Sequence, residues 1–409
     1  MIGNVIVGQS GGPTSVINSS LVGVYKTARD RGAKKVYGML HGIQGFLDEQ
    51  YVDLSTQIHS DMDIELLKRT PSAFLGSCRY KLPESLEDPV YPELFRKFEE
   101  MNIGWFFYIG GNDSMDTVSK LSRYAAQTGS DIRILGEPKT IDNDLIHTDH
   151  TPGFGSAAKY IGASTKEVIR DALGLTYKKE KITIIEDMGR NAGWLTGATA
   201  LAKTEECEGP DLIYLPEVPF DIDVFLSKIK DLLKEKNSII VAVSEGIKLP
   251  DGRYVCELSG GGDYVDAFGH KQLTGTAAYL ANFLGAEIGC KTRAVEFSTL
   301  QRSASHMASR VDINEAFMVG GAAVKAADEG DSGKMVVIDR VSDDPYMSAA
   351  GIYDVHKIAN NEKTVPRAWL NETADYVTEE FINYIEPLIQ GDYPPFMVNG
   401  LPQHLVLKK

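Results

Sequence analysis

The feature that most constrains the fold of this chain is a series of short, continuous apolar runs separated by amphipathic stretches. Strands that are buried on both faces of a sheet show such runs, because neither face requires polar residues. The runs that predict strands cover residues 2–7, 35–40, 104–109, 132–136, 182–185, 212–215 and 239–243. Helical periodicity lies between them, as in residues 224–233, and two more helices are expected to begin near Ser114 and Ser156. This alternation predicts an α/β fold of doubly wound, mostly parallel sheets.

The length of the chain predicts more than one domain. At roughly 150 residues per domain, 409 residues correspond to two or three domains. The best candidate for a boundary is the loop after Gly153, and the stretch from about Asp331 is less periodic, with prolines near its end. We therefore expect a larger domain made of residues 1–153 and about 300–330, a smaller domain of residues 154–300, and a C-terminal accessory segment at residues 331–409.

Charge and cysteine usage exclude several classes of protein. Lys and Arg number 42 and Asp and Glu number 57, which gives a net charge of −15. Surfaces that bind nucleic acid or anionic membranes need clustered cations, so we expect neither partner, whereas a small polyanion needs only a local basic pocket. No apolar run approaches the roughly 20 residues that span a bilayer. Because the N-terminal residues also lack the basic region of a signal peptide and the four cysteines are scattered singly, we expect a cytoplasmic protein.

Polar, glycine-rich segments follow three of the predicted strands, which is where doubly wound sheets bind ligands. The first, residues 8–15 (GQSGGPTS), leads into a helix, and the second is residues 110–114 (GGNDS). Backbone N–H groups of bare glycines can approach a phosphate, and a helix N-terminus favours the anion. A plain strand-to-helix turn explains the first segment equally well, and in the second Asp113 or Ser114 could simply cap the next helix.

The third segment, residues 138–144 (PKTIDND), places a cation beside two carboxylates. Lys139 could stabilise a transferring phosphoryl group, and a carboxylate such as Asp142 could accept the proton of a substrate hydroxyl. A solvated loop is the plain alternative. The chain continues into HTDH at residues 147–150, which leaves a metal site as another alternative, although the spacing is not that of a helical HExxH site.

Later segments add cations and one carboxylate at the ends of predicted elements. Met188-Gly189-Arg190 follows one strand, Glu245 follows another, and Arg293 and Arg302 follow a predicted helix. Arginine forks suit phosphate oxygens, and a carboxylate can accept sugar hydroxyls. Any one of these side chains is more often a surface charge or part of a salt bridge. Their recurrence at strand ends favours a site for a phosphorylated sugar.

Taken in order, these segments resemble the phosphofructokinase family, and within it the pyrophosphate-dependent members. The resemblance runs from Gly8 to about Gly321, and PKTIDND followed by MGR is highly specific. The ordered motifs are SGG at 10–12, GSCRYK at 76–81, GGNDS at 110–114, PKTIDND at 138–144, MGR at 188–190, SEG at 244–246 and TRA…LQR at 292–302.

The resemblance implies a role for each matching residue. Asp142 resembles the base that deprotonates the sugar 1-hydroxyl, with Lys139 and Arg190 beside it, and Asn112 and Asp144 match the surroundings of a magnesium ion. The larger domain would bind the donor and the smaller one the sugar phosphate. The donor site would comprise Gly11, Gly12, Arg79, Gly111, Asp113 and Lys139. The sugar-phosphate site would comprise Thr140, Ile141, Asp142, Lys181, Met188, Gly189, Arg190, Glu245, Arg293, Thr299 and Arg302, in part across a subunit boundary of a homodimer or homotetramer.

Two positions distinguish the donors within the resemblance. ATP-dependent relatives have Gly where this chain has Asp113, and a side chain there would fill the space of the nucleotide α-phosphate and ribose. They also have Gly where this chain has Lys139. Pyrophosphate lacks the additional contacts that a nucleotide makes, and a lysine beside the transferred group could replace them. Both differences indicate pyrophosphate.

Three departures from the family pattern bear on the site. Asn112 stands where the family usually has a magnesium-binding Asp, so the ion would depend more on Asp144 and pyrophosphate. Lys181 stands where short relatives have an Arg that reaches into the neighbouring subunit, which keeps charge but loses bidentate geometry. Thr299 replaces a His or Tyr, and residues beyond about Asp331 have no counterpart in the short bacterial form.

The resemblance therefore implies a cytoplasmic, magnesium-dependent enzyme of glycolysis and gluconeogenesis. It would transfer a phosphoryl group reversibly from pyrophosphate to O1 of fructose 6-phosphate. An ATP-dependent enzyme of the same fold is the nearest alternative, and another ketose phosphate, such as sedoheptulose 7-phosphate, stays open as the acceptor. A regulatory subunit would be expected to lack Asp142, and a metal-dependent hydrolase would depend on the histidines of residues 147–150.

Overall fold

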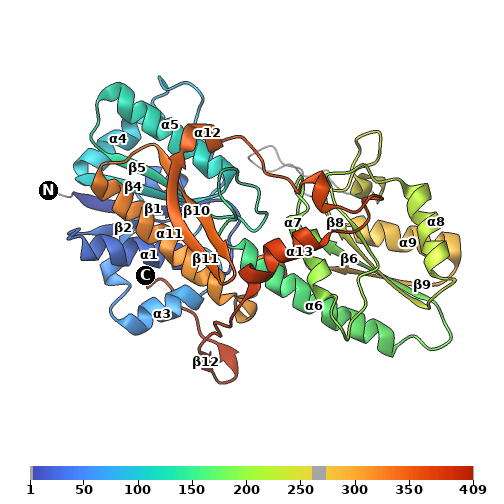
Figure 1. Cartoon of the computed structure of the whole chain (residues 1–409). Helices are drawn as coiled ribbons and strands as arrows, with labels where there is room; N and C mark the ends of the chain where they lie inside the picture. Colours follow the sequence, from blue (N-terminus) through green and yellow to red (C-terminus); the bar gives the residue numbers. More distant parts are fainter. Residues whose placement is uncertain (1–2, 260–272, 409) are drawn as a thin grey trace. The chain divides into compact units, whose positions relative to one another are not determined.

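The computed structural model describes residues 3–259 and 273–408, which form two compact units. Unit 1 comprises Met1–Ser156, Arg302–Glu362 and Gln390–Lys409, and unit 2 comprises Ala157–Gln301 and Lys363–Ile389 (Figure 1). The chain thus passes between the units several times. Helix α6 (Phe154–Gly174) begins in unit 1 and continues into unit 2.

Unit 1 is built on a seven-stranded sheet with the order β11-β10-β5-β4-β1-β2-β3. The five central strands run parallel to one another, and β3 and β11 pair antiparallel at the two edges. The strands are β1 (Asn4–Gln9), β2 (Val36–Met39), β3 (Tyr51–Asp53), β4 (Ile103–Gly110), β5 (Arg133–Pro138), β10 (Lys334–Asp343) and β11 (Tyr346–Asp354).

Both faces of this sheet are covered, which explains the continuous apolar runs. Along β1, Val5 and Val7 pack into one hydrophobic cluster and Ile6 packs into the other. On the first face α1 and α11 lie side by side so closely that a Cβ at Gly320 would lie 2.1 Å from the carbonyl oxygen of Ser20. The helices of unit 1 are α1 (Ile17–Asp30), α2 (Gly42–Leu47), α3 (Asp61–Arg69), α4 (Val90–Glu100), α5 (Asn112–Thr128), α11 (Arg310–Glu329) and α12 (Val355–Ile358).

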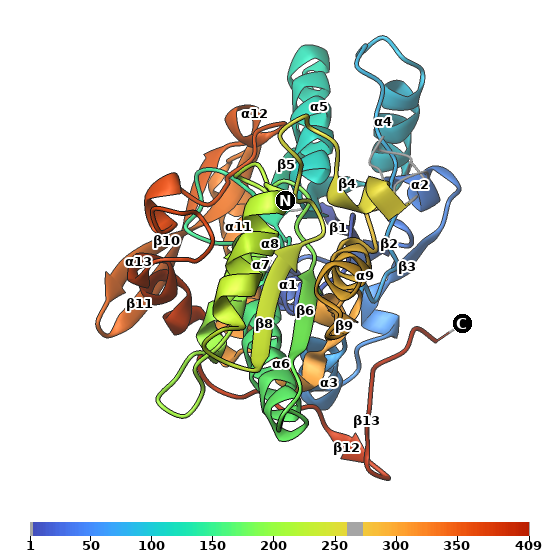
Figure 2. The same ribbon diagram turned by 90° about the vertical axis from the view of Figure 1, so that its right-hand side faces the viewer.

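Unit 2 is built on a four-stranded, wholly parallel sheet with the order β7-β8-β6-β9. Figure 2 shows α9 (Thr276–Ile288) beside β6 and β9, where Ala277, Leu280 and Leu284 enter the core. The strands are β6 (Lys181–Asp187), β7 (Leu212–Tyr214), β8 (Ser238–Ser244) and β9 (Lys291–Glu296). The other helices are α7 (Trp194–Gly197), α8 (Ile222–Leu232) and α13 (Glu379–Ile385), and the four-residue α10 (Leu300–Ser303) lies at the boundary of the two units.

The predicted α/β class and each of the predicted strands are confirmed, but six more described strands were not predicted: four in the two large sheets and the two-residue pair β12 (Met397–Val398) and β13 (Leu401–Pro402). β3, β9, β10 and β11 have mixed or alternating burial, because they are short, exposed or at an edge of a sheet. Residues 331–409, expected as an accessory segment, are divided between the two units: β10 and β11 extend the sheet of unit 1, whereas residues 363–389 belong to unit 2. None of the described helices combines the length and apolarity that a membrane span requires.

Candidate active site

The three glycine-rich segments meet at one edge of the sheet in unit 1. They follow β1, β4 and β5, which are neighbours in the sheet and parallel, so their carboxyl ends lie together (Figure 1). Backbone hydrogen bonds join the segments: the N–H of Ser10 donates to Ile109 (2.9 Å) and that of Lys139 donates to Gly110 (3.0 Å). We call the segment of residues 139–153 the β5 loop.

Lys139 lies at the centre of this edge with only 2% of its surface exposed. Its Nζ donates to the carbonyl oxygen of Gly12 over 2.6 Å. Burial lowers the pKa of Lys139 to about 8, whereas the carboxylates of Asp142 and Asp144 act in the opposite direction. Burial thus costs the ammonium group more stabilisation than the two carboxylates return. A further anion would stabilise its charged form, so the position is suited to bind one.

Two arginines complete the positive surroundings of Lys139. Arg302 and Arg79 both act electrostatically on Lys139, and a Cβ at Gly12 would lie 3.2 Å from Nη1 of Arg302. The segment that carries Arg79 is tied to residues 10–12, because the N–H of Gly11 donates to Cys78 (3.3 Å). The hydroxyl of Ser77 donates to the carbonyl oxygen of Gly11 (2.6 Å). Positively charged side chains therefore lie around the bare backbone of Gly11 and Gly12, as in a phosphate-binding site.

Asp142 and Asp144 lie on the first turn of the β5 loop. The N–H of Asp142 donates to the hydroxyl of Thr140 (3.1 Å), and the left-handed backbone of Asn143 (φ 52°) separates the two carboxylates. Oδ1 of Asp144 is buried without a hydrogen-bond partner among the described residues. Burial, followed by the charge of Asp142, raises the pKa of Asp144 to about 7. Ile141 is 6% exposed, so its side chain belongs to the protein interior.

Helix α5 begins two residues before the expected Ser114. Its N-cap is Gly111, which offers no side-chain cap, so neither Asp113 nor Ser114 has the capping role that the sequence left open. Asp113 lies in the first turn, where the helix dipole favours an anionic group. The amide of Asn112 is engaged elsewhere: Oδ1 accepts from the N–H of Asn360 (2.6 Å) and Nδ2 donates to Asn361 (2.8 Å). This arrangement favours Asp144 over Asn112 as a metal ligand.

The carboxyl end of the sheet in unit 2 brings together Met188–Arg190 and Glu245. The N–H of Glu245 donates to the backbone carbonyl oxygen of Asp187 (2.9 Å), and Oε1 of Glu245 accepts from the N–H of Gly189 (3.4 Å). Gly189 has a φ of 130°, and a Cβ there would lie 2.5 Å from the carbonyl oxygen of Ala192, so only glycine fits. Asp187 was not singled out from the sequence; both of its carboxyl oxygens are buried without a partner among the described residues, and burial raises its pKa well above the ordinary value.

Lys181 and Arg293 lie away from that edge. Lys181 is the first residue of β6 and Arg293 pairs with Thr183, whereas Asp187 ends the same strand; at about 3.3 Å per residue the strand separates Lys181 from Asp187 by roughly 20 Å. Both cations line a cavity of about 290 Å³. The Nζ of Lys181 is buried without a hydrogen-bond partner among the described residues, with Asp171 at 4.0 Å. One chain therefore does not bring Lys181 to Arg190.

The remaining candidates lie at the ends of short elements. Thr299 is exposed and directly precedes α10, in which Arg302 lies. The histidines of residues 147–150 have structural partners: His147 stacks on Tyr353 at 4.0 Å, and both ring nitrogens of His150 face carboxylates. Across residues 3–259 and 273–408, no group of three or more His, Cys, Asp and Glu side chains is arranged to hold a metal ion. This geometry gives no support to a histidine metal site.

Comparisons with known proteins agree with this geometry. The family model described as phosphofructokinase matches residues 4–327. The pyrophosphate–fructose 6-phosphate 1-phosphotransferase of Halomonas elongata is 40% identical, covering 99% of this chain and 96% of that protein, and the one of Xanthomonas campestris pv. campestris is 41% identical with the same coverage. The solved structure of a pyrophosphate-dependent phosphofructokinase from Nitrosospira multiformis is 36% identical with a TM-score of 0.89, covering 100% of this chain and 99% of that one.

Proposed function

We propose that this chain, which belongs to the phosphofructokinase family, transfers a phosphoryl group from pyrophosphate to O1 of fructose 6-phosphate. The products are fructose 1,6-bisphosphate and phosphate, and the reaction is reversible because a phosphoanhydride bond of pyrophosphate stores less free energy than one of ATP. The observation that carries the proposal is Lys139, which is buried beside two carboxylates and held against the bare backbone of Gly12.

The donor site consists of the residues around Lys139. Gly11, Gly12 and Gly111 let the backbone approach the pyrophosphate, and Arg79 and Arg302 bring further positive charge to it. Lys139 stabilises the charge on the transferring phosphoryl group. The contact of Lys139 with Gly12 supports this role, because an oxygen of the donor can take the place of that carbonyl group.

Asp142 accepts the proton of the sugar 1-hydroxyl while O1 forms its bond to phosphorus and the bond to the leaving phosphate breaks. The family motif and the place of Asp142 on the β5 loop, two residues from Thr140 and Asp144, support this assignment. The fixed turn of residues 140–144 holds the carboxylate for proton transfer.

The residues fit a magnesium ion at Asp144. Oδ1 of Asp144 is a buried carboxylate oxygen without a hydrogen-bond partner among the described residues, and the carboxylate of Asp142 is near it. Such oxygens are the ligands that magnesium takes from a protein. Pyrophosphate and water would supply the other oxygens, because the described residues offer no group of three ligands. When bound, magnesium neutralises charge on the pyrophosphate oxygens.

On the family motifs we assign Met188, Gly189, Arg190, Glu245 and Thr299 of unit 2 to the sugar phosphate. The same motifs assign Thr140, Ile141 and Arg302 of unit 1 to it. Since Lys181 and Arg293 lie at the other end of the strands, we assign them to the 6-phosphate in a neighbouring copy of the chain. Their cavity supports this use, because the Nζ of Lys181 has no hydrogen-bond partner among the described residues and the two cations share one carboxylate, that of Asp171. The proposal therefore includes a homodimer or homotetramer with shared sugar sites. A cytoplasmic location is part of it too, since all four cysteines are free.

The test is a comparison of donors. Purified protein receives fructose 6-phosphate and magnesium, and formation of fructose 1,6-bisphosphate is measured with pyrophosphate and with ATP. We expect turnover with pyrophosphate and little with ATP, because the Asp113 side chain occupies the position of a glycine in ATP-dependent relatives. A chain that uses ATP equally well would contradict the roles given to Asp113 and Lys139, but not the fold or Asp142.

A matched variant and an acceptor panel make the comparison sharper. The double variant Asp113→Gly/Lys139→Gly is expected to lose pyrophosphate use and to gain any ATP use that the fold permits. Sedoheptulose 7-phosphate in place of fructose 6-phosphate tests the acceptor. Faster turnover with it than with fructose 6-phosphate would replace the acceptor in our proposal.

A further inference from the structure

Residues 148–153, the return arm of the β5 loop, are hydrogen-bonded to the residues around Asp142. The hydroxyl of Thr151 donates to the carbonyl oxygen of Thr140 (2.8 Å), and the N–H of Thr151 donates to Oδ1 of Asn143 (3.2 Å). A backbone bridge pairs Thr140 with Gly153. The turn that carries Asp142 therefore takes its position from the return arm.

The return arm is in turn held by α11 and β10, whose contacts with it span 159 and 190 residues of the chain. The N–H of Asp149 donates to Ile338 (2.8 Å), whose own N–H donates to the hydroxyl of Thr148 (2.9 Å). The carboxylate of Asp312 accepts from the N–H groups of Gly153 and Ser156 at 2.8 Å each. These bonds attach the two ends of the arm.

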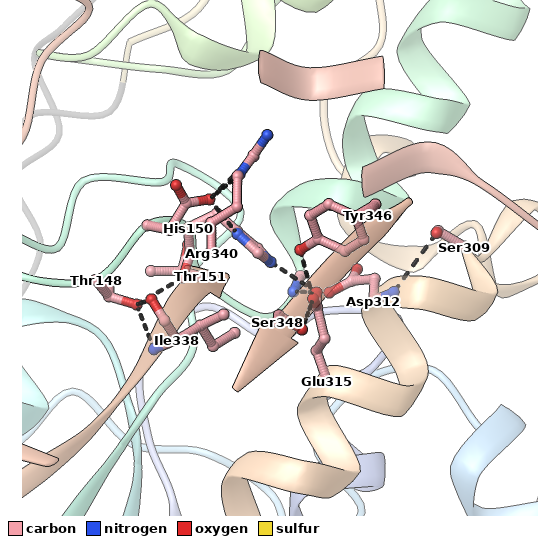
Figure 3. A network of polar contacts seen from close by, with 12 residues as sticks. Thr148, His150, Thr151, Ser309, Asp312, Glu315, Ile338, Arg340, Tyr346 and Ser348 are labelled. Carbon is pink, nitrogen blue, oxygen red and sulfur yellow. Dashed lines mark hydrogen bonds and ion pairs between the residues drawn. The ribbon is translucent and has the colours of Figure 1, made fainter. Parts of the chain in front are cut away.

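His150 lies in the middle of the arm, 1% exposed, at the centre of the polar network in Figure 3. Its Nδ1 is 2.8 Å from Oδ1 of Asp149, and its Nε2 is 2.6 Å from Oε2 of Glu315 on α11. The other oxygen of Glu315 accepts from the hydroxyls of Tyr346 and Ser348 on β11, at 2.6 Å each. Asp149 also accepts from Nε and Nη2 of Arg340 on β10, at 3.1 and 3.0 Å.

The geometry requires His150 to carry a positive charge. Carboxylate oxygens only accept hydrogen bonds, so both ring nitrogens must donate. Burial opposes the charge, but Glu315 and Asp149 together raise the pKa of His150 to about 9. Two cations, His150 and Arg340, thus balance Asp149 and Glu315 in a buried network. Loss of the charge on His150 would leave Glu315 buried without a cation, which is costly.

We propose that His150 is a positioning residue for phosphoryl transfer: its imidazolium joins the return arm to α11 and to the β10–β11 hairpin, and so fixes the turn that carries Asp142. The inference rests on the proposed function, because it concerns how Asp142 is held for that reaction. His150 lies within the network and acts through the arm, without a part in proton transfer.

The proposal separates turnover from donor binding. Lys139 has attachments of its own, through Nζ to Gly12 (2.6 Å) and through its N–H to Gly110 (3.0 Å). Loosening the arm should therefore move Asp142 more than Lys139. A displacement of about 1 Å at a reacting group can reduce turnover by roughly 100-fold.

The decisive variant is His150→Gln, with His150→Gln/Glu315→Gln as its rescue. We expect the single variant to lose kcat by about 10- to 100-fold, with KM for pyrophosphate changed by less than about threefold. The double variant replaces the ion pair by two amides that can bond to each other, so no buried charge is left at Glu315 and most of the lost kcat should return. An unchanged kcat in folded His150→Gln, or a double variant worse than the single one, would overturn the proposal.

Glu65→Gln is the matched control. Glu65 resembles Glu315 in accepting from a tyrosine hydroxyl, that of Tyr393 (2.5 Å), and from a cation, Arg69 (2.5 Å), but it joins α3 to the C-terminal residues. We expect its kcat to equal that of the unmodified chain even where the melting temperature falls. Equal kcat losses in Glu65→Gln and His150→Gln would reduce the role of His150 to general stability.

Two further measurements complement the variants: the first uses the unmodified chain alone, and the second does not require turnover. Among the groups around His150, the pKa values of Asp149 and Glu315 are lowered and those of Arg340 and Tyr346 are raised, so we expect none of these four to titrate between pH 8 and 10. Burial raises the pKa of Asp312, whose carboxylate accepts from the N–H groups of Gly153 and Ser156. The pH dependence of kcat reports the enzyme with its substrates bound, and there the anionic donor raises the pKa of Lys139. At saturating substrates kcat should therefore fall above about pH 9 as His150 loses its proton. A kcat that stays constant up to pH 10 would contradict the proposal.

Hydrogen exchange measured by mass spectrometry follows the arm directly. Peptides covering residues 139–153 should exchange faster in His150→Gln than in the unmodified chain or in Glu65→Gln, whether or not pyrophosphate is the donor. Unchanged exchange would overturn the positioning role. Absence of turnover in the unmodified chain, with the expected exchange, would instead refute the proposed function alone.

Discussion

Two buried lysines show how differently the two units prepare to bind anions. Lys139 in unit 1 is 2% exposed, bonded to Gly12 and flanked by carboxylates, whereas Lys181 in unit 2 is 3% exposed, and its Nζ has no hydrogen-bond partner among the described residues. Burial lowers the pKa of both, with Arg293 adding to the effect at Lys181. Lys139 thus has a hydrogen bond and two carboxylates within unit 1, whereas Lys181 has only the carboxylate of Asp171, 4.0 Å from its Nζ.

The largest expected effect is that of Asp142→Asn in unit 1. The amide cannot accept the proton of the sugar hydroxyl, so we expect kcat to fall by about 1,000-fold, while KM for both substrates changes little. Steady-state kinetics with pyrophosphate and fructose 6-phosphate provide the measurement. A loss below tenfold would mean that another group takes the proton.

Replacing Lys139 by Met should come next. Removal of a charge that stabilises the transferring group costs about 100- to 1,000-fold in similar sites, so kcat/KM for pyrophosphate should fall by that factor. Because the charged form of Lys139 exists below its pKa of about 8, kcat/KM of the unmodified chain should also fall as the pH rises above 8. Lys139→Arg, which stays charged, should lack that alkaline decline.

Lys181→Met tests the contrast from the side of unit 2. A lost charge-assisted hydrogen bond of about 1.5–3 kcal/mol corresponds to roughly 10- to 100-fold in KM for fructose 6-phosphate, with kcat and the KM for pyrophosphate nearly unchanged. Lys178→Met removes an equal charge from outside the cavity lining and should leave every constant as it was. If Lys181→Met instead altered the donor constants, the assignment of the two lysines to separate ligands would be wrong.

The smallest effect concerns magnesium and pH. Asp144 has a pKa raised to about 7, and only its ionised form can bind a cation. The magnesium concentration for half-maximal activity should therefore rise about fivefold between pH 7 and pH 6, and change little above pH 8. Asp144→Asn should remove this dependence and weaken magnesium binding at every pH.

Short-range features of this chain could be predicted well. The strands of both sheets that are buried on two faces appear as apolar runs, and the polar segments after β1, β4 and β5 stand where parallel strands place ligands. The edge strand β11 could not be found, because its burial alternates along a half-exposed hairpin. Asp187 escaped notice because it extends an apolar strand and has no motif of its own.

By itself, the sequence determined the α/β class, the three loops of unit 1 and the identity of their charged residues. Periodicity and turn chemistry are local, and the carboxyl ends of parallel strands share one edge whatever the order of the strands. Only the tertiary structure decided which partners those residues have: His150 meets Glu315 from 165 positions away, Asn112 binds Asn360, and Lys181 lies at the opposite end of its strand from Asp187. Such contacts depend on which strands and helices pack together, and no local pattern records that choice.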